Sequence, residues 1–304
     1  PMLNIITEED VLLSVLPVYH TYEMSAGILA PMLYGATICI SDGIKYVGKN
    51  IKQFKPTVMA LVPLFANQLY KTIQKTIAKQ GKEKTLAFGI KLSNFLSKLH
   101  IDVRRKLFAQ VLEGLGGRLK YFVVGGAALN KETEDFLRLI KFPITVGYGM
   151  TECAPLISFQ VPSLFKSGSC GAILPPELLE AKIMSRDPEN IPGELLVRGE
   201  HVMMGYYKNE EATREVFTED GYFRTGDYGK VEMEGDDQWI YITGRLKNLI
   251  IFSNGKNVYP EEIETEISKL LKGLGLSQDL LYEQMNTLAD KEKVKILLAQ
   301  ALFG

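Results

Sequence analysis

Residues 145–155 read TVGYGMTECAP, an apolar strand that runs into a turn carrying a hydroxyl and a carboxylate. The glycines on either side of Tyr148 permit a sharp turn and a close approach of the backbone to a ligand, and the tyrosine offers a flat face to a base. Thr151 can hydrogen bond to a phosphate oxygen, and Glu152 suits Mg²⁺, a hard cation that prefers oxygen ligands. Taken alone, the run fits equally well a glycine-rich turn with a solvated glutamate.

The sequence before this run alternates between short apolar stretches and segments of helical spacing. The apolar stretches are bounded by Pro, Gly or Asp, as buried strands are. This alternation predicts an α/β domain with a mainly parallel sheet. Strands are expected at 12–16, 37–41, 58–62, 119–124 and 143–147, and helices at 21–34, 46–54, 64–113 with a break near Gly81, and 130–140.

After residue 167 the pattern changes to short strands separated by Gly, Pro and Asp-Gly turns, which is typical of a smaller β-rich region. A charged stretch from residue 260 predicts a helix that breaks near Gly273 and Gly275. Strands are expected at 180–184, 193–198 and 239–243, with a short helix at 208–216.

The length of 304 residues suffices for two domains, or for one large domain with a small appendage. We expect an α/β subdomain, incomplete at its N-terminus, at 1–167, and a β-rich subdomain at 168–245. A truncated C-terminal domain with a helical tail is expected at 246–304.

The composition excludes several classes of protein. Lys and Arg number 35 against 36 for Asp and Glu, so neither a basic nucleic-acid-binding face nor an acidic tail is indicated. Cys39, Cys153 and Cys170 form no CxxC pair, so no disulfide scaffold or zinc site is expected, and a reducing cytoplasm fits best.

No apolar run reaches the roughly 18 residues that span a bilayer. No signal-peptide pattern opens the chain, while peripheral membrane association through an apolar patch stays open.

Three further runs carry groups that suit a nucleotide. Residues 123–129, VVGGAAL, end a strand, where ligands of open α/β sheets bind, and the paired glycines let the main chain lie flat against a planar group. On its own, however, this run fits a structural turn better. In GYFRTGDYG (221–229), Asp227 on a tight turn suits two hydrogen bonds to a ribose diol, although the preceding Asp-Gly pair equally fits a plain hairpin turn. In WIYITGRLKNLIIFSNGKNVYPEEIE (239–264), Arg245 can project from a turn toward phosphate or ribose oxygens.

The chain resembles the acyl- and aryl-adenylating superfamily over about residues 10–266. The resemblance is carried by an ordered set of motifs: YGMTE, then RTGD, then GRLKNLI with NGKNVYPEEIE. That superfamily includes acyl-CoA synthetases, peptide-synthetase adenylation domains and luciferases. The resemblance implies ATP, Mg²⁺ and coenzyme A as cofactors, with Glu152 on Mg²⁺ and Thr151 on the α-phosphate. The residues implied to flank adenine are Gly125, Gly126, Ala127 and Tyr148, and those implied to hold the ribose are Asp227 and Arg245. Gly149 and Met150 are also implied to bind the cofactor. Lys247 would match the hinge of the C-terminal domain, and Gly255 the turn along the pantetheine path.

Residues 16–38, LPVYHTYEMSAGILAPMLYGATI, resemble the family's segment between two acyl-pocket elements. His20 would border the carboxylate, although a lone histidine is equally a structural one. Residues 98–129 are similar to the long-chain fatty acyl-CoA synthetase branch, since luciferases and peptide synthetases have less sequence between the corresponding elements. The resemblance implies activation of a long-chain fatty acid through acyl-AMP to acyl-CoA, with Thr151, Glu152 and His20 as catalytic residues.

Two parts of the family pattern have no match in residues 1–304: the phosphate loop that ends in Pro-Lys-Gly, and the adenylation lysine of the C-terminal domain. The chain is therefore expected to be shortened at both ends of the pattern, and to adenylate poorly by itself because phosphate-binding donors are lost. Two alternatives stay open. One is a catalytically inactive nucleotide- or acyl-binding module of the same fold, and the other is a ligase whose acceptor is the thiol of an acyl carrier protein.

Overall fold

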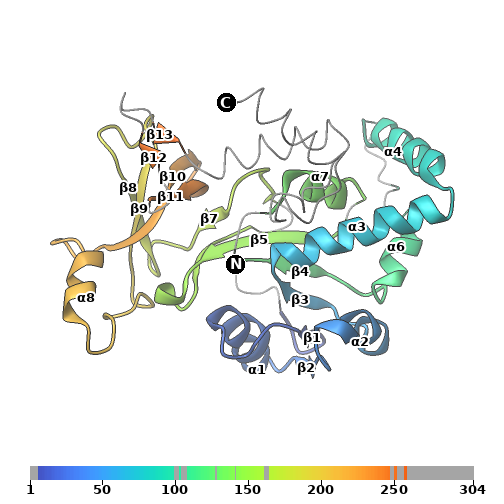
Figure 1. The fold of residues 1–304 in the computed structure, drawn as a ribbon, viewed down its shortest axis with the longest axis horizontal. Helices are drawn as coiled ribbons and strands as arrows, with labels where there is room; N and C mark the ends of the chain where they lie inside the picture. The colour runs from blue at the N-terminus through green and yellow to red at the C-terminus, as the bar shows by residue number, and fades with distance from the viewer. Residues whose placement is uncertain are drawn as a thin grey trace, which may run out of the picture. The chain divides into compact units, whose positions relative to one another are not determined.

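The computed structural model divides into two compact units, and Figure 1 shows the order of the elements along the chain. Each unit is built from several segments of the sequence. Unit 1 comprises Pro1–Lys182, Leu196–Arg224 and Val231–Tyr241, and unit 2 comprises Ile183–Leu195, Thr225–Lys230 and Ile242–Gly304. The residues that the structure describes are 6–98, 103, 108–126, 129–140, 142–160, 164–246, 250–251 and 257–258.

Five parallel strands form the first part of the sheet in unit 1: β1 (Val11–Ser14), β2 (Thr37–Ile40), β3 (Val58–Leu61), β4 (Tyr121–Val124) and β5 (Ile144–Gly149). They follow the order β2-β1-β3-β4-β5, and every neighbouring pair is parallel. The predicted α/β fold with a mainly parallel sheet is thus confirmed in this region. Strand β5 runs further than predicted, into the glycine-rich turn.

Beyond β5 the sheet of unit 1 becomes antiparallel. Strand β6 (Leu156–Phe159) pairs with β5, and β7 (Gly171–Ile173) pairs with β6. Strand β11 (Asp237–Arg245) pairs in turn with β7, through Trp239 opposite Ala172. The sequence did not predict β6 or β7, because runs of four and three residues are too short to show a period.

The longer helices match their predicted positions with two differences, while two short 3₁₀ helices, at Ile44–Tyr46 and Thr151–Cys153, were not predicted. The segment predicted as one helix at 21–34 is a π-helix, η1 (Glu23–Leu29), followed by α1 (Ala30–Leu33). Of the long segment predicted at 64–113, the described part forms separate helices, and the expected break falls at Gly81, whose φ is 61°. The remaining helices of unit 1 are η2 (Ile44–Tyr46), α2 (Val47–Phe54), α3 (Pro63–Lys79), α4 (Glu83–Lys98), α6 (Ala109–Gly114), α7 (Lys131–Leu139), η3 (Thr151–Cys153) and α8 (Glu210–Val216).

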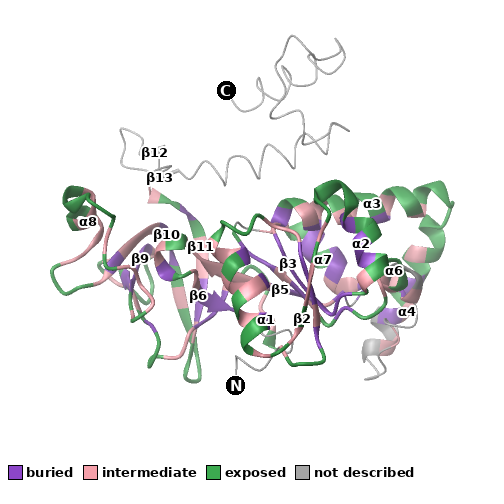
Figure 2. Cartoon of the chain, turned by 90° about the horizontal axis from the view of Figure 1, so that it is seen from below, coloured by how far each residue is buried: buried purple, intermediate pink, exposed green. Residues whose placement is uncertain are grey.

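The two faces of the parallel sheet have different partners, because successive side chains of a strand point to opposite sides. On one face, Met59 and Leu61 of β3 and Phe122 of β4 are fully buried in the main apolar core, together with side chains from α2, α3 and α7. Figure 2 shows buried residues in purple along the central strands and on the adjacent helices. The alternate residues of the same strands, such as Ala60 and Val123, face a cavity instead.

Strands β8 (Glu180–Met184), β9 (Gly193–Arg198), β10 (Phe223–Glu234) and β11 contribute residues to both units. The predicted strands at 180–184 and 193–198 and the short helix near 208–216 are confirmed. The tight turn predicted around Asp227 is wrong: the residue lies within β10, and the turn ends at Gly221. Extended structure is held there by the Thr225 hydroxyl, which donates to the Leu195 carbonyl 2.8 Å away.

Two short strands, β12 (Ile250–Ile251) and β13 (Asn257–Val258), form an antiparallel pair in unit 2. The predicted C-terminal helix and tail lie outside the described residues. The division at 168 and 246 stays a prediction. None of the helices formed by the described residues is long and apolar enough to cross a membrane.

Candidate active site

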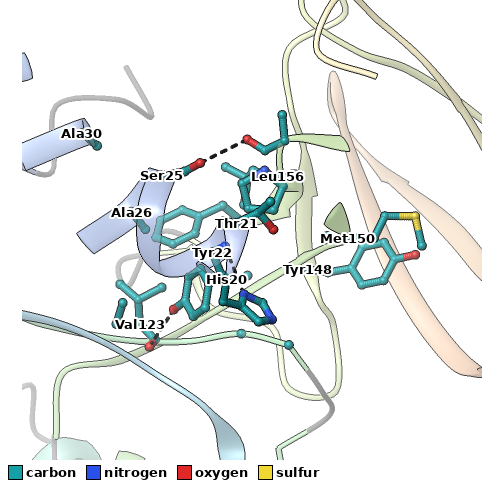
Figure 3. A pocket seen from close by; sticks show the side chains of 18 of the residues that line it. His20, Thr21, Tyr22, Ser25, Ala26, Ala30, Val123, Tyr148, Met150 and Leu156 are labelled. Atoms are coloured by element: carbon teal, nitrogen blue, oxygen red, sulfur yellow. Dashed lines mark hydrogen bonds between the residues drawn. The ribbon is translucent and has the colours of Figure 1, made fainter. Parts of the chain in front are cut away.

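Unit 1 contains a cavity of about 290 Å³ at the carboxyl ends of β4 and β5 (Figure 3). One side is formed by the segment before η1 and by η1 and α1, and the other by the strands and the glycine-rich turns that follow them. Most of the lining is apolar. Of the predicted site residues, the cavity is lined by His20, Gly125, Gly126, Tyr148, Gly149, Met150 and Thr151.

Two glycines of the cavity lie in close contact with their neighbours. A Cβ atom on Gly149 would lie 1.8 Å from the Pro155 carbonyl oxygen, which accepts a hydrogen bond from the Met150 N–H at 2.8 Å. A Cβ atom on Gly125 would lie 3.3 Å from the ring of Tyr22. Gly149 therefore permits the turn that presents the Thr-Glu pair, and Gly125 makes room for a tyrosine.

His20 has one ring nitrogen fixed by the backbone. The N–H of Tyr22 donates to Nδ1 of His20 at 3.2 Å. A neutral imidazole that accepts at one nitrogen carries its proton on the other. The neutral His20 ring therefore presents an Nε2–H donor at the cavity.

Two hydroxyls connect the His20 segment to the turn after β5. The Thr21 hydroxyl donates to the Thr151 hydroxyl at 3.4 Å, and the Ser25 hydroxyl donates to the Ala154 carbonyl at 3.5 Å. The residues His20 and Thr151, which are far apart in sequence, thus line one cavity together.

Glu152 is bound by a different part of unit 1. Its Oε1 accepts a hydrogen bond from the Tyr206 hydroxyl at 3.0 Å, and its backbone carbonyl accepts one from the Met203 N–H at 2.8 Å. No group of three or more His, Cys, Asp and Glu side chains within the described ranges could hold a metal. One carboxylate fits Mg²⁺ nevertheless, since this ion commonly binds one or two carboxylates together with substrate phosphates and water.

The sequence reasoning missed Tyr22 and Glu23. The Tyr22 hydroxyl donates to the Val123 carbonyl at 3.1 Å, a bond drawn in Figure 3, and burial raises the pKa of Tyr22. Glu23 is fully buried, and burial likewise raises the pKa of its carboxyl group. The signal available was the run HTYE, in which an aromatic and an acidic residue directly follow the predicted histidine.

The predicted ribose residues lie in unit 2 and contact each other. Nε of Arg245 is 3.1 Å from Oδ1 of Asp227; the Asp227 side chain is buried, whereas that of Arg245 is exposed. The N–H of Gly226 donates to Glu194 at 3.2 Å, which fixes the strand next to the aspartate. Three predicted residues, Ala127, Lys247 and Gly255, lie outside the described residues.

The fold is that of the N-terminal part of adenylating enzymes. The solved structure of O-succinylbenzoate coenzyme A synthetase (MenE) from Bacillus subtilis, in complex with ATP and a magnesium ion, matches with a TM-score of 0.62 and 25% identity. The match covers 87% of this chain and 47% of that chain. Over residues 2–207 the sequence matches the AMP-binding enzyme family, and the chain belongs to this family.

Curated relatives carry the names of fatty acid ligases. Long-chain-fatty-acid–CoA ligase FadD15 of Mycobacterium bovis is 31% identical over 269 residues, which are 84% of this chain and 43% of the relative. Long-chain-fatty-acid–CoA ligase ACSBG2 of Rattus norvegicus is 27% identical over 285 residues, which are 88% of this chain and 42% of the relative. The chain thus spans less than half the length of these relatives.

Proposed function

We propose that this chain is the ATP-handling part of an enzyme that activates a long-chain fatty acid through acyl-AMP to acyl-CoA. The observation that carries the proposal is the cavity, because its lining combines the glycine-rich turns and the Thr151 hydroxyl with a mostly apolar wall. Similarity to the long-chain-fatty-acid–CoA ligases supports the choice of substrate class.

The apolar wall suits an acyl chain. Tyr121, Val123 and Gly125 succeed one another on the cavity side of β4 and just beyond it, and Val58 and Ala60 do so on β3. From residue 121 to residue 125 an extended strand rises about 13 Å. Each methylene group buried along such a wall contributes about 0.8 kcal/mol to binding.

The polar end of the cavity suits the reacting groups. We assign the Nε2–H of His20 as a donor to the fatty acid carboxylate, and Thr151 as a donor to the α-phosphate. Tyr148, between two glycines that line the same cavity, would stack on adenine. Glu152 would hold Mg²⁺, which neutralises charge on the phosphates when it is bound.

The remaining assignments extend the proposal to the rest of the chain. Asp227 and Arg245 would hold the ribose, since a carboxylate accepts two hydrogen bonds from a diol and Arg245 can donate to the same sugar. Lys247 would serve as the hinge, and Gly255 would line the pantetheine path.

The reaction has two steps. The fatty acid carboxylate attacks the α-phosphorus of ATP, and pyrophosphate leaves. The thiol of coenzyme A then attacks the acyl carbonyl carbon, and AMP leaves. The residues of this chain contribute by positioning the carboxylate in line and by donating to charge that develops in the transition state. An acyl carrier protein thiol could replace coenzyme A in the second step without any change in the first.

An ATP–pyrophosphate exchange assay tests the proposal, with saturated fatty acids from octanoate to stearate added separately. The expected result is weak exchange, because phosphate-binding donors are missing from this chain, that requires a fatty acid and rises with chain length. Binding of cis-parinaric acid, a fluorescent fatty acid, supplies a second readout that does not require turnover. Absence of both binding and exchange across the series would overturn the proposal.

A matched pair of variants localises the acyl site. Ala60→Phe fills the cavity from β3, and Ile40→Phe adds a comparable ring to β2, where the side chain is 67% exposed. We expect at least a tenfold loss of cis-parinaric acid affinity for Ala60→Phe and none for Ile40→Phe. Melting temperatures of both variants report whether the fold is retained. Equal affinities in two folded variants would place the fatty acid elsewhere.

A further inference from the structure

One segment of unit 1, residues 201–206, is anchored along the turn that carries Glu152. Nε2 of His201 lies 3.0 Å from the Leu156 carbonyl oxygen. The Met203 N–H donates to the carbonyl of Glu152 at 2.8 Å, and the Tyr206 hydroxyl donates to its side chain at 3.0 Å. Two of these three contacts therefore end on Glu152, one on its backbone and one on its carboxylate.

The position of Tyr206 is fixed by its own neighbours. Its N–H donates to the Thr213 hydroxyl at 2.9 Å, and that hydroxyl donates to the Asn209 carbonyl at 2.8 Å. A Cβ atom on Gly205 would lie 2.6 Å from Cγ2 of Thr213, so a glycine is required before the tyrosine. The side chain of Asn209 accepts from the Ala212 N–H at 3.1 Å and caps α8. The Thr213 hydroxyl of α8 thus fixes the backbone of Tyr206.

The hydrogen bond has a defined direction. A carboxylate only accepts hydrogen bonds, and a tyrosine hydroxyl carries its proton near neutral pH, so Tyr206 donates and Glu152 accepts. A carboxylate offers about four lone-pair positions on its two oxygens. One donor from Tyr206 therefore orients the group and leaves it able to bind a cation.

We propose that Tyr206 is a positioning residue for Glu152, holding its carboxylate in the orientation that binds a divalent cation carried by a nucleoside triphosphate. This inference rests on the proposed function, because it takes Glu152 as the residue that receives Mg²⁺. Partners that hydrogen bond to metal ligands fix their orientation, and their loss typically lowers metal affinity about 10- to 100-fold.

A purely structural role for the contact makes a different prediction. If Tyr206 served only to attach its segment to η3, its loss would disturb the whole turn, including Thr151. Binding of AMP without metal and binding of ATP with metal would then weaken together. A positioning role weakens only the part of the affinity that Mg²⁺ supplies.

The test is a fluorescence titration of the full chain with mant-ATP over a series of MgCl₂ concentrations, and with mant-AMP in EDTA. Tyr206→Phe removes only the hydroxyl. Tyr207→Phe is the matched control, because the neighbouring side chain is 88% exposed. Glu152→Gln marks the complete loss of the charged ligand.

For Tyr206→Phe we expect the MgCl₂ concentration at half-saturation to rise about 10-fold. The mant-AMP affinity should stay within about twofold of the parent chain, as should both values for Tyr207→Phe. A Tyr206→Phe chain with the parent half-saturation, or with both affinities lowered equally, would overturn the positioning role while the proposed function stands. If the mant-ATP affinity of the parent chain does not depend on the MgCl₂ concentration, the assignment of Glu152 as a metal ligand is overturned, and the inference with it.

Discussion

Two aspartates of unit 1, Asp10 and Asp220, both have a pKa of about 2, yet they lie in opposite surroundings. Asp10 is 1% exposed. Burial alone would raise its pKa, and hydrogen bonds from Thr57, Lys120 and Thr7 outweigh that effect. Asp220 lies on the surface, and hydrogen bonds from Lys182 and then from Thr218 lower its pKa.

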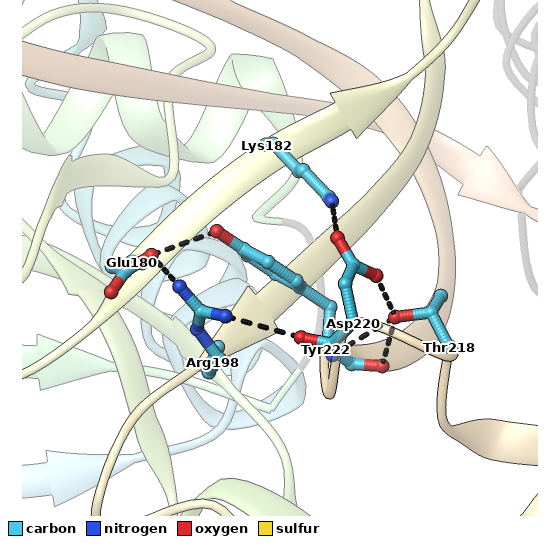
Figure 4. A network of polar contacts seen from close by, with 6 residues as sticks. All are labelled: Glu180, Lys182, Arg198, Thr218, Asp220 and Tyr222. Carbon is cyan, nitrogen blue, oxygen red and sulfur yellow. Dashed lines mark hydrogen bonds and ion pairs between the residues drawn. The ribbon is translucent and has the colours of Figure 1, made fainter.

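The exposed aspartate belongs to a larger group of charges drawn in Figure 4. Nζ of Lys182 is 2.5 Å from Asp220, and Arg198 is 2.6 Å from Glu180. The Tyr222 hydroxyl also donates to Glu180 at 2.8 Å. Such contacts replace water contacts of similar strength, and surface ion pairs contribute little to stability.

The buried aspartate connects two strands of the sheet. Its Oδ1 accepts from the Thr57 hydroxyl at 2.7 Å, just before β3, and lies 2.9 Å from Nζ of Lys120, just before β4. Its Oδ2 accepts from the Thr7 N–H at 2.9 Å. Removing Asp10 takes the acceptor at 2.7 Å from the buried Thr57 hydroxyl, and an unsatisfied buried donor costs free energy. The exposed Asp220 carries no such cost, because water can replace its contacts. A similar pKa therefore does not imply a similar contribution to folding.

The largest effect is expected for Asp10→Ala. The substitution leaves the Thr57 hydroxyl and the Thr7 N–H without their acceptor, and should lower the free energy of unfolding by about 3 kcal/mol. Urea denaturation followed by circular dichroism measures the change. A loss no larger than that of a surface variant would show that the buried contact is replaced by water.

Acid should remove much of the same contribution. The pKa of Asp10 is lowered from 3.8 to about 2, so its stabilising effect is complete above pH 4 and disappears as the pH falls toward 2. The linked free energy is about 2 kcal/mol. In urea denaturation at several pH values, the stability gap between the parent chain and Asp10→Asn should narrow over this window. A constant gap would contradict the lowered pKa.

A smaller effect is expected for Thr57→Val, which retains shape and removes the hydroxyl. That hydroxyl donates to Asp10 and also accepts from the Val11 N–H at 2.9 Å. We expect a loss of about 1.5 kcal/mol in the free energy of unfolding. Thr57→Ser, which keeps the hydroxyl, is the control and should retain most of the stability. Equal losses for the two variants would assign the effect to packing.

The smallest effect is expected for Asp220→Asn. The side chain is exposed, and water replaces the contacts to Lys182 and Thr218 once the charge is removed. The melting temperatures of the parent chain and the variant should agree within error at both low and high salt. A drop comparable to that of Asp10→Ala would overturn the distinction between the two aspartates.

The sequence predicted the strands and helices of unit 1 well where they are long or apolar. Strand β3 and helix α7 fall where expected, because an apolar run is a local signal and because α7 is capped locally, by the Asn130 side chain that accepts from the Glu132 N–H. Strands β6 and β7 were missed because they are short and form through pairing with partners that the local pattern does not reveal. The turn predicted around Asp227 was wrong for the same reason, since hydrogen bonds to other segments keep β10 extended.

The motifs of the candidate site were visible in the sequence, but their neighbours were not. The run TVGYGMTECAP by itself determined a strand, a glycine-dependent turn and a hydroxyl–carboxylate pair, because backbone conformation there depends on residues close in the chain. Only the tertiary structure decided that His20 lines the same cavity as Thr151, that Tyr206 donates to Glu152, and that Asp10 meets Thr57. These contacts join residues far apart in sequence, and it is the packing of the sheet and its helices that brings them together.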